Sequence, residues 1–179
     1  MTPADNVAHQ TSNIDDLPYR RGVGVALFNR QGQVWIGRRI AKPGQAIENY
    51  WQMPQGGIDK HEKPKKAVFR ELKEETGTDR AEIIGKTKSW LTYDLPENLI
   101  GVAWGGKYRG QKQKWFAMLF TGNDSDFDLG RYDKPEFDAW KWVELQSLPG
   151  LIVPFKRSIY DGIVAKFADM PEKIARGEL

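Results

Sequence analysis

"GGIDKHEKPKKAVFRELKEETGT", residues Gly56 to Thr78, is the stretch that decides the fold. Between Pro64 and Gly77 it is filled with Lys, Ala, Arg, Glu and Leu, which are residue types that favour a helix. Pro is tolerated in the first turn of a helix and Gly commonly follows the last turn, so both ends of the helix are predicted. Apolar or small side chains recur at steps of about 3.6 residues and predict one buried face. These side chains are Ala67, Val68, Leu72 and Thr76.

The same helix gathers three carboxylates on one face, because Glu71, Glu74 and Glu75 stand at positions i, i+3 and i+4. Two charges about 6 Å apart repel by roughly 0.7 kcal/mol in water and by about 3 kcal/mol at an effective dielectric constant of 20. An ion pair between Arg70 and Glu74 returns only about 0.3–0.5 kcal/mol. The cluster therefore predicts a hard divalent cation, Mg²⁺ or Mn²⁺, and with it phosphate chemistry. A solvated helix face is the alternative interpretation.

The composition of the 179 residues is that of a globular protein, with 40% hydrophobic and 28% charged residues. We expect a single domain over residues 18–179 and a flexible tail over residues 1–17, which lack the basic start and apolar run of a secretory signal. No apolar run approaches the ~20 residues of a membrane span. The absence of Cys excludes disulfides, cysteine nucleophiles and Cys-based zinc sites and fits a cytoplasmic protein. The net charge of +3 permits a polyanionic ligand.

Strands are predicted on both sides of this helix from runs of β-branched and apolar residues. The predicted strands are residues 22–29, 34–39, 51–54, 81–95, 113–122 and 137–145. Residues 40–50 are expected to form a polar loop and residues 55–59 a turn. Apolar side chains at i, i+4 steps predict a second amphipathic helix over residues 155–170, ended by Pro171. Strands alternating with helices indicate the α/β class with a mixed sheet.

The spacing of the acidic segment resembles a known family motif. Reading from Gly56, five residues precede Glu62, and seven more precede the run from Arg70 to Thr78. This arrangement resembles the Nudix box, G-x5-E-x7-R-E-U-x-E-E-x-G-U, in which U is aliphatic. Thr78 is the one departure, at a position that serves packing. The resemblance implies a Nudix-type α/β/α sandwich with a mixed sheet, and a hydrolase that cleaves a phosphoanhydride in a nucleoside diphosphate linked to another group.

Roles for the residues of the motif follow from the resemblance. It implies that metal ions are bound by Glu71, Glu74, Glu75 and the backbone of Gly56. Glu71 also serves as the base in some members, and Arg70 pairs with Glu62 to hold the loop against the helix. More than one Mg²⁺ or Mn²⁺ ion would neutralise phosphate charge and activate the attacking water.

The resemblance extends from about residue 18 to residue 170. "SWLTYDLP", "GQKQKWF", "PEFDAWKWV" and "FKRSIY" are similar to the bacterial RNA pyrophosphohydrolases and to asymmetric dinucleoside tetraphosphate (Ap4A) hydrolases. The first group removes pyrophosphate from 5′-triphosphorylated RNA, and the second splits Ap4A into ATP and AMP. Both substrates stay open, because both carry a polyphosphate on the 5′ side of a nucleoside. Within this resemblance Glu136 would complete the metal site.

Substrate-binding candidates also come from the resemblance. Arg20 and Arg39 would grip phosphates, with surface charge at strand ends as the alternative. Phe155 would stack on a base beside the cation Lys156, although Phe155 also fits the apolar stripe of the last helix.

Two lysines are candidates because of their position on one strand. Lys112 and Lys114 alternate with glutamines, so both point to one face and are placed to meet a polyanion or solvent. Four tryptophans offer either base stacking or core packing. These are Trp51, Trp90, Trp104 and Trp115.

A non-catalytic module that binds RNA or nucleotides is the second functional hypothesis. The mildly basic composition and the lysine-rich strand are consistent with it. Such a module has no need for Glu71, Glu74 and Glu75, and all three are present. The sequence therefore favours the enzyme, with a nucleotide or an RNA 5′ end as its substrate and no obligate protein partner.

Overall fold

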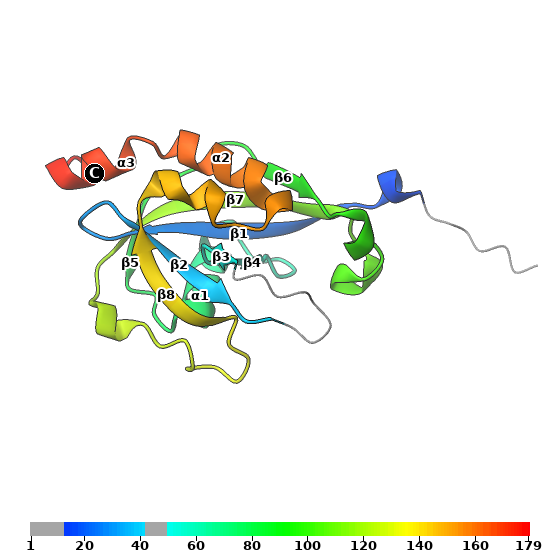
Figure 1. The fold of residues 1–179 in the computed structure, drawn as a ribbon, viewed down its shortest axis with the longest axis horizontal. Helices are drawn as coiled ribbons and strands as arrows, with labels where there is room; N and C mark the ends of the chain where they lie inside the picture. The colour runs from blue at the N-terminus through cyan, green and yellow to red at the C-terminus, as the bar shows by residue number, and fades with distance from the viewer. Residues whose placement is uncertain (1–12, 42–49) are drawn as a thin grey trace, which may run out of the picture.

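The computed structural model describes residues 13–41 and 50–179, and Figure 1 shows one mixed sheet covered by helices. The helices are α1 (Pro64–Thr76), α2 (Arg157–Lys166) and α3 (Met170–Arg176). The strands are β1 (Tyr19–Phe28), β2 (Val34–Arg39), β3 (Trp51–Gln52), β4 (Gln55–Gly57), β5 (Ala81–Lys86), β6 (Leu91–Asp94), β7 (Gly110–Phe120) and β8 (Phe137–Val143). Most of the predicted flexible tail and most of the predicted polar loop lie outside the described residues.

The centre of the sheet is the parallel pair of β1 and β7, in register from Tyr19 opposite Gly110 to Phe28 opposite Leu119. β1 and β2 pair antiparallel at Phe28 and Val34, and from there β1 continues with β4 while β2 continues with β3 and β8. The sheet therefore divides into two halves that are joined near one end of β1.

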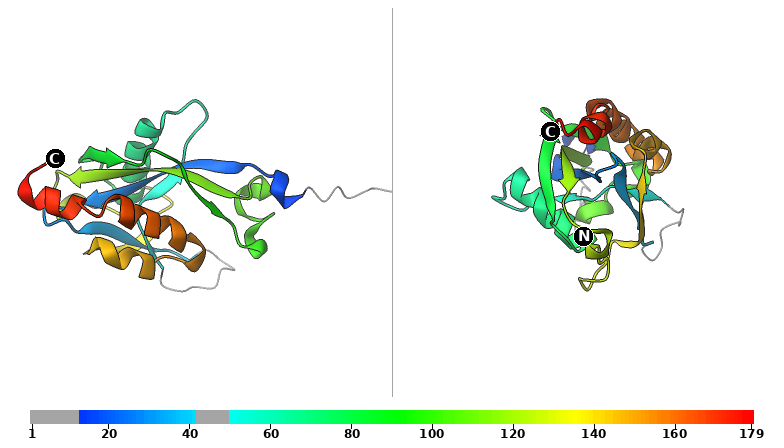
Figure 2. Two further views of the ribbon diagram at one scale, coloured as in Figure 1. Left: turned by 90° about the horizontal axis from the view of Figure 1, so that it is seen from above. Right: turned by 90° about the vertical axis from the view of Figure 1, so that its left-hand side faces the viewer.

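Helices lie on both faces of this sheet, which confirms the predicted α/β/α sandwich (Figure 2). Alternate residues of β1 and β7 point to opposite faces, and each face has its own buried cluster. The cluster on the α2 side includes Phe28, Trp115, Ile159 and Ile163. The cluster on the α1 side includes Val25, Leu27, Leu72 and Met118. Within the two described ranges, no helix is long and apolar enough to cross a bilayer.

The bounds of α1 agree with the prediction from the acidic segment. Pro64 stands in its first turn, and Gly77 ends it in the left-handed conformation at φ +82°. The N–H of Gly77 donates to the carbonyl of Lys73 at 2.9 Å and so satisfies one of the last carbonyls. The predicted apolar stripe is buried. It consists of Ala67, Val68, Leu72 and Thr76.

Three predictions about individual elements are wrong. Residues 55–57, predicted as a turn, form β4, because Gly56 and Gly57 gain strand partners in β1 that their own propensity does not predict. The run 81–95 is two strands, interrupted at Thr87, whose N–H donates to the carbonyl of Trp115. The helix predicted over residues 155–170 spans only Arg157–Lys166 as α2, and Pro171 does not end it but lies in the first turn of α3, where a Pro loses no helical hydrogen bond.

Leu72 anchors α1 to the sheet with a side chain that is 1% exposed. Leu72→Ala is expected to lower the free energy of unfolding by about 2–5 kcal/mol, since it removes buried methyl groups and leaves a cavity. Urea unfolding followed by circular dichroism measures this change. Lys65→Ala, at an exposed position of the same helix, is the control and should shift stability by less than about 0.5 kcal/mol. Equal effects of the two substitutions would contradict the packing described for α1.

Candidate active site

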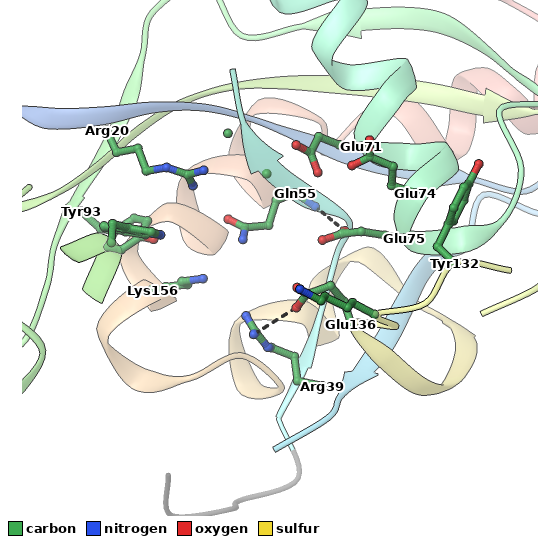
Figure 3. A pocket seen from close by; sticks show the side chains of 14 residues that line it. Arg20, Arg39, Gln55, Glu71, Glu74, Glu75, Tyr93, Tyr132, Glu136 and Lys156 are labelled. Carbon is green, nitrogen blue, oxygen red and sulfur yellow. Dashed lines mark hydrogen bonds and ion pairs between the residues drawn. The ribbon is translucent and has the colours of Figure 1, made fainter. Parts of the chain in front are cut away.

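A cavity of about 520 Å³ opens where the two halves of the sheet diverge, and Figure 3 shows the side chains that surround it. Eight of the sequence-predicted site residues line it. They are Arg20, Arg39, Gly56, Glu71, Glu74, Glu75, Glu136 and Lys156. They come from β1, β2, β4, α1, the segment before β8 and the turn before α2, so the fold brings together residues that are far apart in the chain.

Glu71, Glu74 and Glu75 of α1, which we call the acidic wall, line one side of the cavity and pack against β4. A Cβ atom at Gly56 would collide with the carboxylate of Glu71, so a larger residue would displace this carboxylate from its present position. The backbone N–H of Gln55 donates to Oε2 of Glu75 at 2.8 Å. β4, which the sequence did not predict, thus contacts the carboxylates of Glu71 and Glu75.

Burial sets the protonation behaviour of these carboxylates. It raises the pKa of Glu75 well above its ordinary value, against the opposing hydrogen bond from the N–H of Gln55. Burial also raises the pKa of Glu71, while the guanidinium of Arg70 acts in the opposite direction. Buried carboxylates gain free energy from a cation placed beside them, because the cation replaces the solvation that burial removes.

One guanidinium ties the acidic wall to the loop before it. Nε and Nη2 of Arg70 donate to the two carboxylate oxygens of Glu62 at 2.9 and 2.7 Å, and Nη2 also donates to the carbonyl of Gly57 at 2.9 Å. Nη1 of Arg70 donates to Glu71 at 2.8 Å and to Glu74 at 3.3 Å. Arg70 therefore lies behind the acidic wall and contacts both the loop and the helix.

A basic side of the cavity faces the acidic wall. Figure 3 shows Arg20, Lys156 and Arg39 pointing toward the carboxylates from the other elements. Nη2 of Arg39 lies 3.2 Å from Oε2 of Glu136 and so connects the two sides. Burial lowers the pKa of Lys156 to about 8, and the nearby guanidinium of Arg39 adds to this effect. Opposed cations and carboxylates suit a ligand that carries both phosphate groups and divalent cations.

The oxygen donors that line the cavity fit a hard divalent cation. Four carboxylates and the glycine backbone at residue 56 offer oxygen ligands, which Mg²⁺ and Mn²⁺ prefer. Across residues 13–41 and 50–179, no group of three acidic, histidine or cysteine side chains is close enough to hold an ion as it stands. The four carboxylates instead have partners within the protein, since Glu71 and Glu74 face Arg70, Glu75 accepts from Gln55 and Glu136 faces Arg39.

Several residues that line the cavity were missed by the sequence analysis. They are Gln55, Gly57, Tyr93, Tyr132 and Lys134. The hydroxyl of Tyr93 donates to Gln111 at 2.9 Å, and Nε2 of Gln113 donates to Gln111 and to Gln55, so a buried polar chain runs beneath the cavity. The alternation of Gln111 and Gln113 with lysines was the signal for this chain, because it places both glutamines on the inner face.

Trp104, one of the four tryptophans named from the sequence as candidates for base stacking or core packing, also lines the cavity and has an unusual backbone conformation. Its φ of +53° lies in the left-handed region, which is rare for a bulky residue. The guanidinium of Arg20 lies 5.3 Å from the centroid of its ring. The strained turn therefore presents the indole of Trp104 to the cavity beside Arg20, which is predicted to bind phosphate.

The other predicted substrate-binding residues do not line the cavity. Phe155 packs against the core cluster under α2, with its ring centroid 5.8 Å from that of Tyr93. Lys112 and Lys114 lie on the opposite face of β7, beside Trp90. Among the candidate stacking residues, Trp115 is 1% exposed and belongs to the core.

Comparison with known proteins identifies relatives over most of the chain. The family model described as the NUDIX domain matches residues 18–163. An RNA pyrophosphohydrolase of Gluconacetobacter diazotrophicus is 59% identical over 156 residues, which cover 86% of this chain and 93% of that protein. An RNA pyrophosphohydrolase of Rhodospirillum rubrum is 53% identical over 152 residues, which cover 85% of this chain and 88% of that protein.

Solved structures share the fold at low sequence identity. A C. elegans Ap4A hydrolase binary complex matches with a TM-score of 0.58 and 20% identity, over 83% of this chain and 98% of that one. The E. coli dihydroneopterin triphosphate pyrophosphohydrolase matches with a TM-score of 0.59 and 18% identity, over 83% of this chain and 99% of that one. Both agree with the mixed sheet and the covering helices.

The Arg70–Glu62 pair predicts a pH-dependent contribution to stability. Hydrogen bonds from Arg70 lower the pKa of Glu62 from 4.5 to about 2. Because the folded-state pKa is depressed, the contribution is present above pH 4.5 and is lost as the pH falls to about 2. Glu62→Gln is expected to lower stability at pH 7 by about 1.5–3 kcal/mol.

Urea unfolding of both proteins between about pH 7 and pH 2 tests this linkage. The stability difference should narrow only as the pH falls through the window named above. A difference that stays constant across that window would contradict the assigned role of the pair. Glu82→Gln, at an exposed strand position, is the control and should show no such change.

Proposed function

The chain belongs to the NUDIX domain family, and we propose that it hydrolyses a phosphoanhydride in 5′-triphosphorylated RNA, in Ap4A, or in both. The relatives of 59% and 53% identity are RNA pyrophosphohydrolases, which supports a pyrophosphohydrolase rather than the non-catalytic binding module. The observation that carries the proposal is a cavity in which four glutamates face Arg20, Arg39 and Lys156.

We propose divalent metal ions, Mg²⁺ or Mn²⁺ and more than one of them, as the cofactors. The residues proposed to hold them are Glu71, Glu74, Glu75, Glu136 and the backbone at Gly56. When bound, such ions supply charge neutralisation to the polyphosphate and make water a better nucleophile.

The side chains of the protein perform the remaining tasks of the proposed reaction. Arg20, Arg39 and Lys156 bind phosphate oxygens and hold the polyphosphate across the cavity. Glu71, buried against β4, is placed to accept the proton of the attacking water. Arg70 positions this carboxylate through the hydrogen bond from its Nη1. Phosphoryl transfer needs little covalent work from the protein, so positioning and charge are sufficient.

The relatives at 59% and 53% identity are named RNA pyrophosphohydrolases, which favours RNA among the two proposed substrates. We therefore propose 5′-triphosphorylated RNA as the main substrate and Ap4A as a secondary one. We also propose a cytoplasmic location and activity without an obligate protein partner.

Glu74→Gln tests the acidic wall, since the side chain of Glu74 is 48% exposed and its substitution should leave the fold intact. With Mg²⁺ and triphosphorylated RNA, kcat is expected to fall by at least about a hundredfold, because a charged ligand is lost. Glu82→Gln, at an exposed position of β5, removes the same charge outside the cavity and should retain full activity. Near-normal turnover of the Glu74 variant would overturn the proposed site.

The choice of substrate is tested by kcat/KM for triphosphorylated RNA and for Ap4A in one buffer. We expect the value for RNA to be the higher by at least about tenfold, a difference of about 1.4 kcal/mol in transition-state stabilisation. A bias of that size toward Ap4A would reverse the proposed order of the two substrates.

A further inference from the structure

Three cations surround one indole ring on the α1 face of β1 and β7, which is opposite to the face on which Arg20 lines the cavity. The guanidinium carbon of Arg21 and the ammonium groups of Lys112 and Lys114 lie 5.4, 5.8 and 5.4 Å from the ring centroid of Trp90. We call these four residues the Trp90 surface. Cation–π attraction to a single ring explains why like charges gather at this point.

The position of the Trp90 surface follows from the alternation of side chains along β1 and β7. Arg20 lines the cavity, so its neighbour Arg21 points to the other face. Strand register places Arg21 opposite Lys112, which brings the two cations side by side. β1 thus contributes Arg20 to the cavity and Arg21 to the Trp90 surface, while β7 supports the cavity from beneath through Gln113 and contributes Lys112 and Lys114 to the Trp90 surface.

The charge of the Trp90 surface is not balanced within the described parts of the chain. None of its three cations forms an ion pair there with an Asp or Glu side chain. The ammonium group of Lys114 donates instead to the backbone carbonyl of Lys88. Gathered cations without a carboxylate attract a polyanion, because its binding relieves their mutual repulsion.

We propose that the Trp90 surface binds the phosphate backbone of an RNA strand whose 5′ end occupies the cavity. Trp90 directly precedes β6, and Tyr93 of that strand lines the cavity. Three residues of a strand span about 10 Å, so the surface lies a few nucleotides from the cavity, around the edge of the sheet. Trp90 holds the cations, and the cations contact the phosphates.

This inference rests on the proposed function for its ligand, since it is the RNA 5′ end in the cavity that leads the strand to the surface. Contacts to phosphates carry no sequence information, so the surface would serve RNAs of any sequence. Ap4A has no nucleotide chain beyond its two nucleosides and would gain nothing from it. The Trp90 surface therefore favours RNA over Ap4A by chain length.

Binding of a single-stranded RNA of about ten nucleotides with a 5′-hydroxyl group tests the surface without catalysis. The test variant is R21Q/K112Q/K114Q. The control variant is R30Q/K166Q/R176Q, which removes three charges from the opposite end of the molecule, near α3 (Figure 1). Each phosphate contact to a single strand contributes about −0.7 to the slope of log K against log [salt], so the test variant should flatten the slope by about 2.

The control variant is expected to keep the wild-type slope. If both variants flattened the slope of log K against log [salt] equally, the effect would come from net charge alone, and the inference would be overturned. Loss of binding to anionic phosphatidylglycerol vesicles by the test variant, with RNA binding unchanged, would also overturn it, since the surface would then serve a membrane.

Hydrolysis provides the second readout, as the ratio of kcat/KM for a long and for a two-nucleotide triphosphorylated RNA. The test variant should lower this ratio by roughly tenfold, whereas the control should not. Trp90→Ala should lower it in part and Trp90→Phe should restore it, because a phenyl ring also attracts cations. If the wild-type protein hydrolyses neither RNA, the proposal of RNA as the main substrate fails while the binding measurement still decides the surface. If hydrolysis occurs and the ratio is the same in all variants, the surface fails alone.

Discussion

The hydrogen bonds of Arg70 are the interaction on which the rest of the site depends. One guanidinium donates to Glu62 in the loop, to the backbone carbonyl of Gly57 in β4, and to Glu71 and Glu74 on α1. A planar group with five fixed donors can satisfy so many acceptors at once, which a lysine cannot. Because Glu71 and Glu74 lie on a face crowded with negative charge, the same contacts also compensate that charge where no other cation is present.

The division of the sheet decides what this charged helix faces. β1 and β2 separate beyond Phe28 and Val34, and the segment that crosses from one half to the other supplies β3 and β4. The glutamates of α1 reach the opening from one side, and Arg20 and Lys156 reach it from the other. Like charges are therefore grouped on each side and opposite charges face each other, which suits a polyphosphate with bound cations better than either group alone.

The central strands serve both faces of the sheet at once. The inward glutamines of β7 form a buried polar chain with Tyr93 and Gln55, and its outward lysines gather around Trp90. A period of two along a strand makes this division unavoidable, because neighbouring side chains point in opposite directions. A strand with alternating Gln and Lys thus connects a cavity that handles the reacting phosphates with a surface suited to the chain that carries them.

The sequence by itself determined the elements that depend on local order. Three features are properties of nearby residues in the chain. They are the two ends of α1, marked by Pro64 and Gly77, the shared face of Glu71, Glu74 and Glu75, and the spacing from these glutamates to Glu62. Only the tertiary structure decided what depends on distant partners. It made a strand of residues 55–57 through pairing with β1, placed Trp104 against Arg20, and turned the lysines of β7 away from the cavity. Pairing and facing between distant strands carry no signal in a local pattern, because the free energy that fixes them comes from contacts that exist only after the chain has folded.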